Sequence, residues 1–537
     1  MKLDRESLKD RGAWEAAGVA LPSFDIDGMI GSTRESPVWV HFGAGNIFRG
    51  YIASLQQRLI ESGAEASGIV AAETFDDEII DKIYKPHDAL ALLVSLSPDG
   101  GMKKEIIASI AYGVKASSAE GMDELKRLFA KPSLRMASYT ITEKGYALED
   151  IKGEPLPVFA SDAKLGPALA KHAISITAAL LLERYKSGAH PIAMVSMDNC
   201  SRNGEKLRSA VWKAADAWLG NGFVDDGFIE YLRDESRVSF PWSMIDKITP
   251  RPDAQVRDAL INAGIGGMDV IVTGKSTYIA PFVNAEVPQY LVVEDKFPNG
   301  RPPLERAGVY MADRDTVNRT ETMKVTTCLN PLHTALAVLG CLLGYDRISA
   351  EMNDPDLKKL VERIGYQEGM PVVVDPGIIS PRGFIREVIE ERFPNPFMPD
   401  APQRIATDTS QKLLIRFGET IKRYIASDDL DVTELKCIPF VLAAWARYLM
   451  GLGDDGKPMS ISPDPMLGML QPMLAGVELG KPESYKGQLR PMLANENIFG
   501  VDLVKEGLAA KIEGFFVEML RGAGAVRDAL GKVVAMD

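Results

Sequence analysis

A glycine-rich turn at residues 43–50 carries the first groups in the sequence whose types and spacing suggest chemistry. Gly43-Ala44-Gly45-Asn46-Ile47-Phe48-Arg49-Gly50 follows a short apolar run, and helical spacing begins directly after it. Glycine at 43 permits a tight turn, and glycine at 45 lets the backbone approach a pyrophosphate. The amide donors and dipole of a helix N-terminus favour such an anion. Phe48 holds the place of the usual third glycine, so the pattern alone also fits a plain tight turn.

An acidic residue follows at the end of the second apolar run. Glu73 closes the run GIVAAE at 68–73, about where a carboxylate meets the adenosine ribose hydroxyls of NAD. A carboxylate there would repel the additional phosphate of NADP. Asp76 and Asp77 are equally good candidates, and Glu73 also fits a helix cap. We therefore expect NAD as the cofactor, bound by Gly43, Gly45, Asn46, Ile47, Phe48, Arg49 and Glu73.

The elements that must position these residues are short strands alternating with helices. Apolar runs that end in polar residues occur at 37–42, 68–73, 106–114, 136–142 and 191–196, with helical stretches between several of them. Ile52, Leu55 and Leu59 show helical spacing directly after the glycine turn. Strands that alternate with helices predict a largely parallel, doubly wound sheet.

The second half of the chain has a different pattern. From about residue 330, long amphipathic stretches such as PLHTALAVLGCLLGY predict helices and few strands. The polar, Pro- and Gly-rich connection EDKFPNGRPP predicts a boundary near 285–300. Because single cores stop growing at about 250–300 residues, a chain of 537 residues also favours two domains. We expect a doubly wound α/β domain at 1–290 and a mostly helical domain at 291–537.

Charge and composition exclude several classes of partner. A formal charge of −13 disfavours nucleic acid and anionic membrane surfaces. The N-terminal MKLDRESLKDRG lacks the apolar run of a secretory signal, and we expect no later apolar stretch to approach the roughly 20 residues of a membrane span. We therefore expect a cytoplasmic protein that acts on a small molecule and binds neither nucleic acid nor membranes. Its oligomeric state is open.

The cysteines and histidines predict no metal site. The four cysteines contain no CxxC pair, and the five histidines contain no HxH or HxxxH pair and do not cluster with cysteines at ligand spacing. Reduced cysteines that serve mostly in packing are the expected result. The residues concerned are Cys200, Cys328, Cys341, Cys437, His41, His87, His172, His190 and His333.

The glycine turn and five later segments together resemble the long-chain polyol-specific dehydrogenases, the mannitol dehydrogenase family. The later segments are Thr142-Glu143-Lys144-Gly145-Tyr146, Ser196-Met197-Asp198-Asn199 with Asn203-Gly204, Phe240 to Pro250, Lys324 through Asn330 to His333, and Arg404 to Leu413. All six stand in the family's order. The resemblance implies a Rossmann-like N-terminal domain, a helical C-terminal domain, an active site in the cleft between them, and chemistry without a metal.

The resemblance also implies roles for individual residues. Oxidation of a secondary alcohol needs a base and fixed donors for the developing alkoxide. Lys324 is similar to the family's base, and Asn199 and Asn330 are similar to its paired amide donors. His333 is similar to a residue that positions the substrate. A lysine acts as a base near neutral pH only if burial or nearby positive charge lowers its pKa. The remaining candidate substrate contacts are Asp246, Arg404 and Lys412.

Structural explanations compete with these roles. Lys324 also fits a solvated lysine beside a core helix, and His333 fits a hydrogen-bonded histidine on a helix face. Asn199 and Asp246 could each be present because a turn favours Asn or Asp at that position, without any contact to the substrate. Cys328, which lies within the same segment, fits packing better than nucleophilic chemistry.

One departure from the family pattern concerns the phase of a helix. Five residues separate Lys324 from Asn330, where the family has four. In one regular helix the added residue would rotate Lys324 by about 100° relative to Asn330. Either a bulge absorbs the extra residue, or Lys324 lies in a non-helical segment that precedes the helix.

The expected substrate is a ketonic hexuronate. The turn is similar to that of the family's uronate reductases, and cations in the helical half can hold a carboxylate. These cations are Arg404, Lys412, Arg382 and Arg386. Arg404 and Lys412 share a helical face only if their segment is helical throughout, and solvated surface charge explains them as well.

Three functions therefore remain open at the level of sequence. The resemblance favours NAD-dependent, metal-independent reduction of fructuronate or tagaturonate to mannonate or altronate, and the reverse oxidation. A polyol dehydrogenase such as mannitol 2-dehydrogenase, or a relative that acts on a sugar phosphate, is the first alternative. A nucleotide-binding regulator that has lost catalysis is the second.

Overall fold

The computed structural model describes residues 1–536, which divide into two compact units. The first comprises Met1–Ser97 and Gly101–Asn318, and the second comprises Pro98–Gly100 and the chain from Arg319 onward. The division falls after Asn318, whereas the sequence pattern places it near residue 290. The Pro- and Gly-rich connection is a loop between β14 (Tyr290–Glu294) and β15 (Tyr310–Ala312). These strands pair in parallel, so the loop stays within the first unit.

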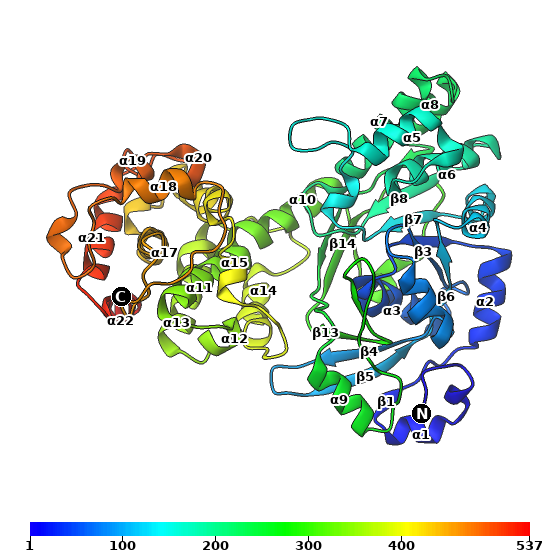
Figure 1. Ribbon diagram of the computed structural model, residues 1–537, viewed down its shortest axis with the longest axis horizontal. Coiled ribbons are helices and arrows are strands. Elements are labelled where there is room, and N and C mark those ends of the chain that lie inside the picture. The colour runs from blue at the N-terminus through cyan, green and yellow to red at the C-terminus, as the bar shows by residue number, and fades with distance from the viewer. Residues whose placement is uncertain (537) are drawn as a thin grey trace. The chain divides into compact units, whose positions relative to one another are not determined.

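A six-stranded parallel sheet forms the centre of the first unit (Figure 1). Its order is β6-β3-β2-β7-β8-β9, and every neighbouring pair is parallel. The strands are β2 (Trp39–Phe42), β3 (Ile69–Glu73), β6 (Ile110–Lys115), β7 (Met136–Tyr139), β8 (Ile192–Ser196) and β9 (Val238–Ser239). Four of them coincide with apolar runs of the sequence. The run at 106–114, predicted as one strand, instead contains the end of β5 (Met102–Ile107) and most of β6.

Helices cover both faces of this sheet. Along β2, Val40 and Phe42 belong to one hydrophobic core and Trp39 to another, because successive side chains of a strand point to opposite faces. The helices of the first core include α4 (Ala119–Ala130), α6 (Ala173–Lys186), α7 (Asn203–Gly220) and α8 (Asp226–Arg233), and α3 (Ala53–Glu61) belongs to the second. The first unit is thus the doubly wound Rossmann domain that the sequence predicts.

Smaller sheets extend the first unit. A four-stranded mixed sheet has the order β1-β5-β4-β13, a three-stranded sheet has the order β10-β14-β15, and β11 pairs with β12. The strands not yet given are β1 (Val19–Ala20), β4 (Ala91–Leu96), β10 (Ser243–Asp246), β11 (Ile271–Val272), β12 (Tyr278–Ile279) and β13 (Phe282–Glu286). The remaining helices of this unit include α1 (Arg11–Ala16), α2 (Ile26–Glu35), α5 (Pro157–Leu165) and α9 (Ala254–Asn262).

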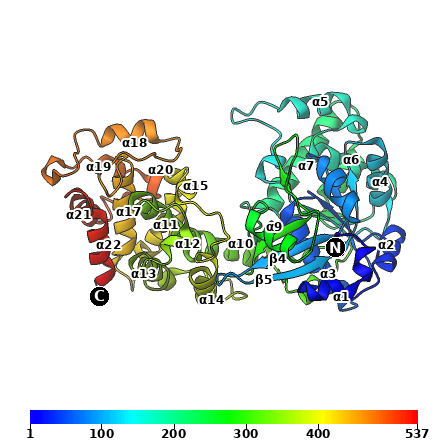
Figure 2. The same ribbon diagram turned by 60° about the horizontal axis from the view of Figure 1, so that its bottom comes forward.

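The second unit is helical, and no strand occurs among its residues up to 536. Its centre is α17 (Cys437–Tyr448), which is buried along its whole length and packs against α11 (Asn330–Leu343) and α21 (Ala509–Met519) (Figure 2). Around them lie α12 (Ile348–Glu351), α13 (Pro355–Arg363), α14 (Pro381–Glu387), α15 (Pro402–Ile405), α16 (Glu419–Ile425), α18 (Leu467–Met473), α19 (Arg490–Leu493), α20 (Glu496–Phe499) and α22 (Ala525–Ala535). This architecture agrees with the sequence prediction.

The helix over Arg314–Leu343 is long and apolar enough to span a membrane, although no stretch of this kind was expected from the sequence. It consists of α10 (Arg314–Met323), a π-helical segment η8 (Lys324–Cys328) and α11. The most apolar part of this helix is mostly buried inside the protein. Burial of this kind is typical of a core helix, so its apolar composition is explained by packing.

Candidate active site

The glycine turn lies at the carboxyl end of β2. Gly43 has φ 106°, and a Cβ at this position would lie 2.2 Å from the carbonyl oxygen of Thr140. Only glycine fits there, because both the conformation and the close approach of β7 exclude a side chain. At Gly45, by contrast, a Cβ would meet nothing within 4 Å. The backbone at Gly45 is therefore open to a ligand.

A cavity of about 840 Å³ adjoins this turn and lies entirely within the first unit. Its wall follows the carboxyl ends of β2, β3 and β7, where doubly wound sheets bind their ligands. Residues of this wall include Gly43, Gly45, Glu73, Thr74, Phe75, Asp76, Thr140, Thr142, Lys144, Lys171, His172, Lys275 and Thr277. The open backbone at Gly45, the two glycines and the size of the cavity fit a dinucleotide.

Glu73 is held in this wall by backbone amides. Its Oε2 accepts a hydrogen bond from the Ala44 amide at 2.9 Å, and its Oε1 accepts from the amides of Thr74, Phe75 and Asp76 at 3.0, 2.8 and 3.1 Å. Burial raises the pKa of this carboxyl, and the four amides act in the opposite direction. Glu73 therefore joins the end of β3 to the glycine turn. Of the two alternative acids, Asp76 accepts a hydrogen bond from Thr273 and Asp77 accepts one from Ser117.

The side chains after the glycines support the turn from behind. Arg49 is buried, and its guanidinium donates to the Ala280 carbonyl and to Asn46 Oδ1, both at 2.8 Å. Asn46 in turn donates to the Pro250 carbonyl at 3.3 Å. Phe48 is buried and stacks on His41, with ring centroids 4.2 Å apart. None of these side chains, nor that of Ile47, is part of the cavity wall, so the structure groups them with the packing of the turn.

Asn199 follows a carboxylate that ties two strand ends together. Asp198 accepts hydrogen bonds from the amides of Ile141 and Thr142, each at 2.9 Å, and from the Tyr146 hydroxyl at 2.5 Å. Thr142 has φ 64°, which is uncommon for a residue other than glycine. Asp198 thus fixes the segment after β7 beside the end of β8. The sequence predicted no role for Asp198, because the pairing of an acid with amides of another loop leaves no signal in residue spacing.

The two other candidates of this unit differ in exposure. The Asn199 side chain is exposed, immediately after Asp198. Asp246 is buried at the end of β10, and only 5% of its surface is exposed. Both lie at carboxyl ends of strands, and the structure does not group either with the wall of the large cavity.

In the second unit, Lys324 begins the π-helical segment η8. Its side chain is 3% exposed, and Asn330 begins α11 after Leu329, whose φ and ψ are −130° and −63°. A π-helical turn holds one more residue than an α-helical turn. The extra residue between Lys324 and Asn330 is therefore absorbed by a bulge in the helix, which was one of the two alternatives. Lys324 is not a solvated lysine.

His333 lies on the first turn of α11. Its Nε2 is 3.6 Å from the nearer Asp400 oxygen, and its ring packs against Phe393 with centroids 5.2 Å apart. Burial lowers the pKa of His333 to about 3, and four cations, Arg416, Arg404, Arg392 and Lys412, add to this effect. The imidazole is therefore neutral near pH 7, so that one ring nitrogen donates a hydrogen bond and the other accepts one.

Arg404 and Lys412 both lie close to His333, but not on one helix. α15 ends at Ile405, and a short 3₁₀ segment (Thr409–Gln411) precedes Lys412, so the condition of a continuous helical face is not met. Arg404 pairs with Asp400, and its side chain is 65% exposed. The Lys412 ammonium donates to the carbonyls of Ile405 and Thr407, and burial lowers its pKa. The irregular segment between Arg404 and Lys412 reverses direction, so both cations lie near His333.

Two of the four cations that lower the pKa of His333 were not predicted from the sequence. Arg392 lies in the π-helical segment η11 (Val388–Arg392) and Arg416 in η13 (Leu414–Gly418). Arg382 and Arg386, which the sequence suggested instead, are exposed, and neither is among the largest influences on the pKa of His333. Cys328 is buried, and burial raises the pKa of its thiol, which agrees with a packing role. Among residues 1–536, no group of three or more His, Cys, Asp or Glu side chains is arranged to hold a metal ion.

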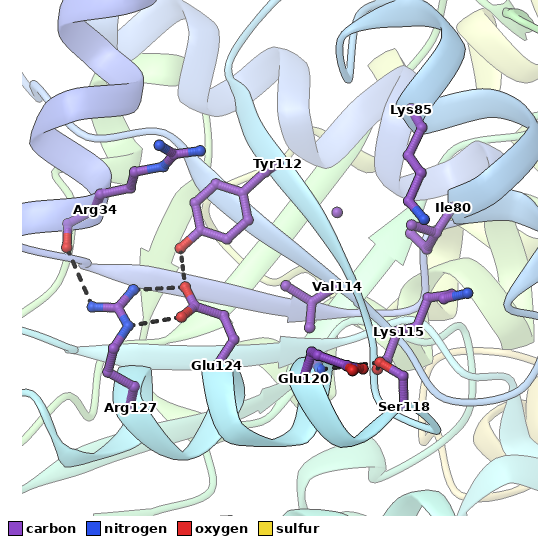
Figure 3. Close-up of a pocket in the computed structure, with 12 residues that line it drawn as sticks. Arg34, Ile80, Lys85, Tyr112, Val114, Lys115, Ser118, Glu120, Glu124 and Arg127 are labelled. Carbon is purple, nitrogen blue, oxygen red and sulfur yellow. Dashed lines mark hydrogen bonds and ion pairs between the residues drawn. The ribbon is translucent and has the colours of Figure 1, made fainter.

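A second cavity of about 580 Å³ lies along the edge strand β6 (Figure 3). Four of its charged side chains, Lys85, Lys115, Glu124 and Arg127, form ion pairs. Glu124 accepts two hydrogen bonds from Arg127 and one from Tyr112, while Lys85 and Lys115 both pair with Asp81. Because most of its charged side chains are already paired, this cavity offers fewer groups for chemistry than the two regions above.

Comparisons with known proteins cover nearly the whole chain. The model of the mannitol dehydrogenase Rossmann domain matches residues 38–306, and that of the mannitol dehydrogenase C-terminal domain matches residues 316–519. The D-mannonate oxidoreductase of Thermotoga maritima is 53% identical over 540 residues, covering 100% of both chains.

Two further proteins are more distant. The polyol:NADP oxidoreductase of Gluconobacter oxydans is 30% identical, over 88% of this chain and 90% of that protein. The structure of mannitol 2-dehydrogenase from Pseudomonas fluorescens, a ternary complex with NAD and D-mannitol, is similar with a TM-score of 0.70 at 27% identity, covering 100% of each chain.

Proposed function

We propose that this chain, which belongs to the mannitol dehydrogenase family, is an oxidoreductase. It interconverts D-mannonate and fructuronate with NAD(H) and without a metal. The observation that carries this proposal is the 53% identity, over the full length of both chains, to a D-mannonate oxidoreductase. The cations around His333 support a substrate that carries a carboxylate.

The proposed roles of the residues follow the chemistry of carbonyl reduction. The bound cofactor supplies the hydride, and the protein must deliver a proton to the carbonyl oxygen as the C–O double bond becomes single. We assign that proton to the Lys324 ammonium, which is regenerated from solvent. The amides of Asn199 and Asn330 stabilise negative charge on the same oxygen. Asp246, His333, Arg404 and Lys412 bind and orient the sugar acid.

The preference for NAD over NADP rests on Glu73. Its carboxylate is fixed at the end of β3 on the wall of the large cavity, where it would repel a 2′-phosphate. The turn at Gly43 and Gly45 would hold the pyrophosphate. Three lysines of the same wall, Lys144, Lys171 and Lys275, would attract a 2′-phosphate. The preference for NAD therefore depends on how close the 2′ position lies to Glu73.

A cytoplasmic location forms part of this proposal. All four cysteines are free thiols, as expected for a reducing compartment. Cell fractionation of a producing organism, with a periplasmic marker as control, tests this point.

The test of the function is a steady-state panel. Fructuronate, tagaturonate and fructose are compared with NADH and NADPH at one ionic strength. We expect the highest kcat/KM for fructuronate with NADH. Polyol dehydrogenase is the second candidate, supported by the structural similarity to mannitol 2-dehydrogenase. A kcat/KM for fructose equal to or above that for fructuronate would favour it and contradict the uronate proposal.

A further inference from the structure

Arg416 is a cation without a carboxylate partner, and it lies beside the first turn of α11. Its guanidinium donates one hydrogen bond, to Thr334 Oγ1, and it forms no ion pair with any residue of the described chain, 1–536. Burial lowers the pKa of Arg416 to about 10, which leaves it charged at neutral pH. A charge that is partly removed from water and not paired is costly, unless a ligand supplies the opposite charge.

The position of Arg416 connects it to the candidate substrate contacts. Thr334, which accepts its hydrogen bond, donates in turn to the Asn330 carbonyl at 2.9 Å and is the neighbour of His333 in the chain. The segment η13, which carries Arg416, packs against both η8 and α11. The guanidinium is therefore held next to the two helical segments that carry Lys324, Asn330 and His333.

Two of the other cations near His333, Arg404 and Lys412, are less available. Arg404 is paired with Asp400, and Lys412 donates to two backbone carbonyls. The carboxylates that act on Lys412 are Asp408 and Asp464, and Asp464 already accepts hydrogen bonds from the Ser410 amide and hydroxyl. Among Arg404, Lys412 and Arg416, only Arg416 combines a half-buried position with a guanidinium that makes a single hydrogen bond.

We propose that the Arg416 guanidinium binds the carboxylate of the sugar acid and is the residue that distinguishes a hexuronate from a neutral ketose. This inference rests on the proposed function and deepens it. A planar guanidinium presents parallel N–H groups that match the two oxygens of a carboxylate, and the bond to Thr334 fixes its plane. A hydroxymethyl group in place of the carboxylate leaves the cation unpaired, so a neutral ketose is rejected.

The experiment compares fructuronate with fructose in the wild type, Arg416→Gln and Arg416→Lys, with saturating NADH. For Arg416→Gln we expect kcat/KM for fructuronate to fall by about 10- to 150-fold, mainly through KM, while kcat/KM for fructose changes little. Arg416→Lys keeps the charge but not the planar pair of donors, and it should recover part of the loss.

Arg423→Gln is the matched control, because Arg423 is also a half-buried arginine and donates to a threonine, Thr326, on η8. Any loss in this variant should affect both substrates equally. A fructuronate-to-fructose ratio that stays at the wild-type value in both Arg416 variants would overturn the inference. If Arg416→Gln does not fold, Arg416→Lys decides alone by the same ratio. A wild type that does not prefer fructuronate would overturn the proposed function itself, which this series reveals before any variant is made.

Discussion

The surroundings of Glu73 and of His333 show two opposite ways of placing charge inside one chain. Glu73 is a buried carboxylate whose two oxygens accept four backbone hydrogen bonds from its own domain. His333 lies among four cations, and of these Arg416 has no carboxylate partner in the described chain. The first charge is satisfied by the fold, whereas the second needs something that the fold does not supply.

This difference teaches where a ligand contributes to stability and where it does not. A carboxylate that accepts several amide hydrogen bonds holds a loop in place with or without a ligand. Uncompensated cations raise the free energy of the folded state, and an anionic ligand removes that cost when it binds. Under the proposed function, the glycine turn is a preformed site, and the region around His333 would have its charge completed by the carboxylate of the substrate.

The largest effect is expected from Lys324→Ala, which tests whether the cationic region performs chemistry. Loss of the proton donor should lower kcat by about 10²–10⁴-fold, while the affinity for NADH stays nearly unchanged because Lys324 lies outside the dinucleotide-binding unit. Single-turnover rates and NADH fluorescence titration measure the two quantities. Lys422→Ala, which removes a lysine paired with Glu419 in the same unit, serves as control. A variant that keeps more than about a tenth of the turnover would rule out the assigned role.

A buried carboxyl without partners extends the comparison to stability. Glu351 is 0% exposed, neither of its oxygens has a hydrogen-bond partner, and Oε1 lies against Gly340 of α11. Burial raises its pKa to about 9, above the value of 4.5 that it has in water. The folded state keeps this proton while the unfolded chain loses it. The stabilising contribution is therefore complete below about pH 4.5 and decreases as the pH rises toward 9.

Glu351→Gln should remove this pH dependence, because a neutral amide replaces a carboxyl that must stay protonated. Between pH 4.5 and pH 8, a slope of about 1.4 kcal/mol per pH unit amounts to about 5 kcal/mol, and we expect the variant to be more stable than the wild type by on the order of this amount at pH 8. Urea unfolding at pH 5 and pH 8 measures this. Glu368→Gln is the contrasting control, since Glu368 accepts three amide hydrogen bonds at the start of α17, and its loss should destabilise. Equal stabilities of Glu351→Gln and wild type at pH 8 would show that Glu351 is ionised and solvated.

The smallest effect is expected from Glu73→Ser, which tests whether the satisfied carboxylate also selects the cofactor. Relief of repulsion should raise the ratio of kcat/KM for NADPH over NADH by about 10-fold or more, the usual worth of a charged hydrogen-bond partner. Asp77→Ser, in the same loop but outside the cavity wall, should leave this ratio unchanged. Wild-type use of NADPH as efficient as that of NADH would refute the assignment.

Much of this architecture could be predicted because it follows from local patterns. The apolar runs that end at Phe42, Glu73 and Ser196 coincide with ends of parallel strands, since buried strands need continuous apolar sequence. The turn at Gly43 was visible because a positive φ restricts the residue type. The domain boundary was placed too early, because a Pro- and Gly-rich segment marks a loop and does not show whether the strands on either side pair.

The cation cluster was only half visible in the sequence. Arg404 and Lys412 were predicted as substrate contacts because they belong to a motif of the family. Arg392 and Arg416 belong to two separate π-helical segments, outside that motif. Their approach to His333 depends on how irregular helices pack, and no periodicity encodes it. Likewise, Glu73 accepts a hydrogen bond from the Ala44 amide, and Asp198 accepts one from the Thr142 amide. These loops come close together only when the sheet is folded.

The π-helical segment Lys324–Cys328 also bears on how this chain can be aligned with others and how it can change over time. A gap of one residue in an alignment has a physical location here, within 325–329, because that is where the helix holds one residue more than its α-helical turns require. Loss of that residue would convert the π-helical turn into an α-helical turn and leave Lys324 facing the same way relative to Asn330 and His333. A single codon deletion at this point could thus remove the bulge while the side chains on both sides of it keep their directions.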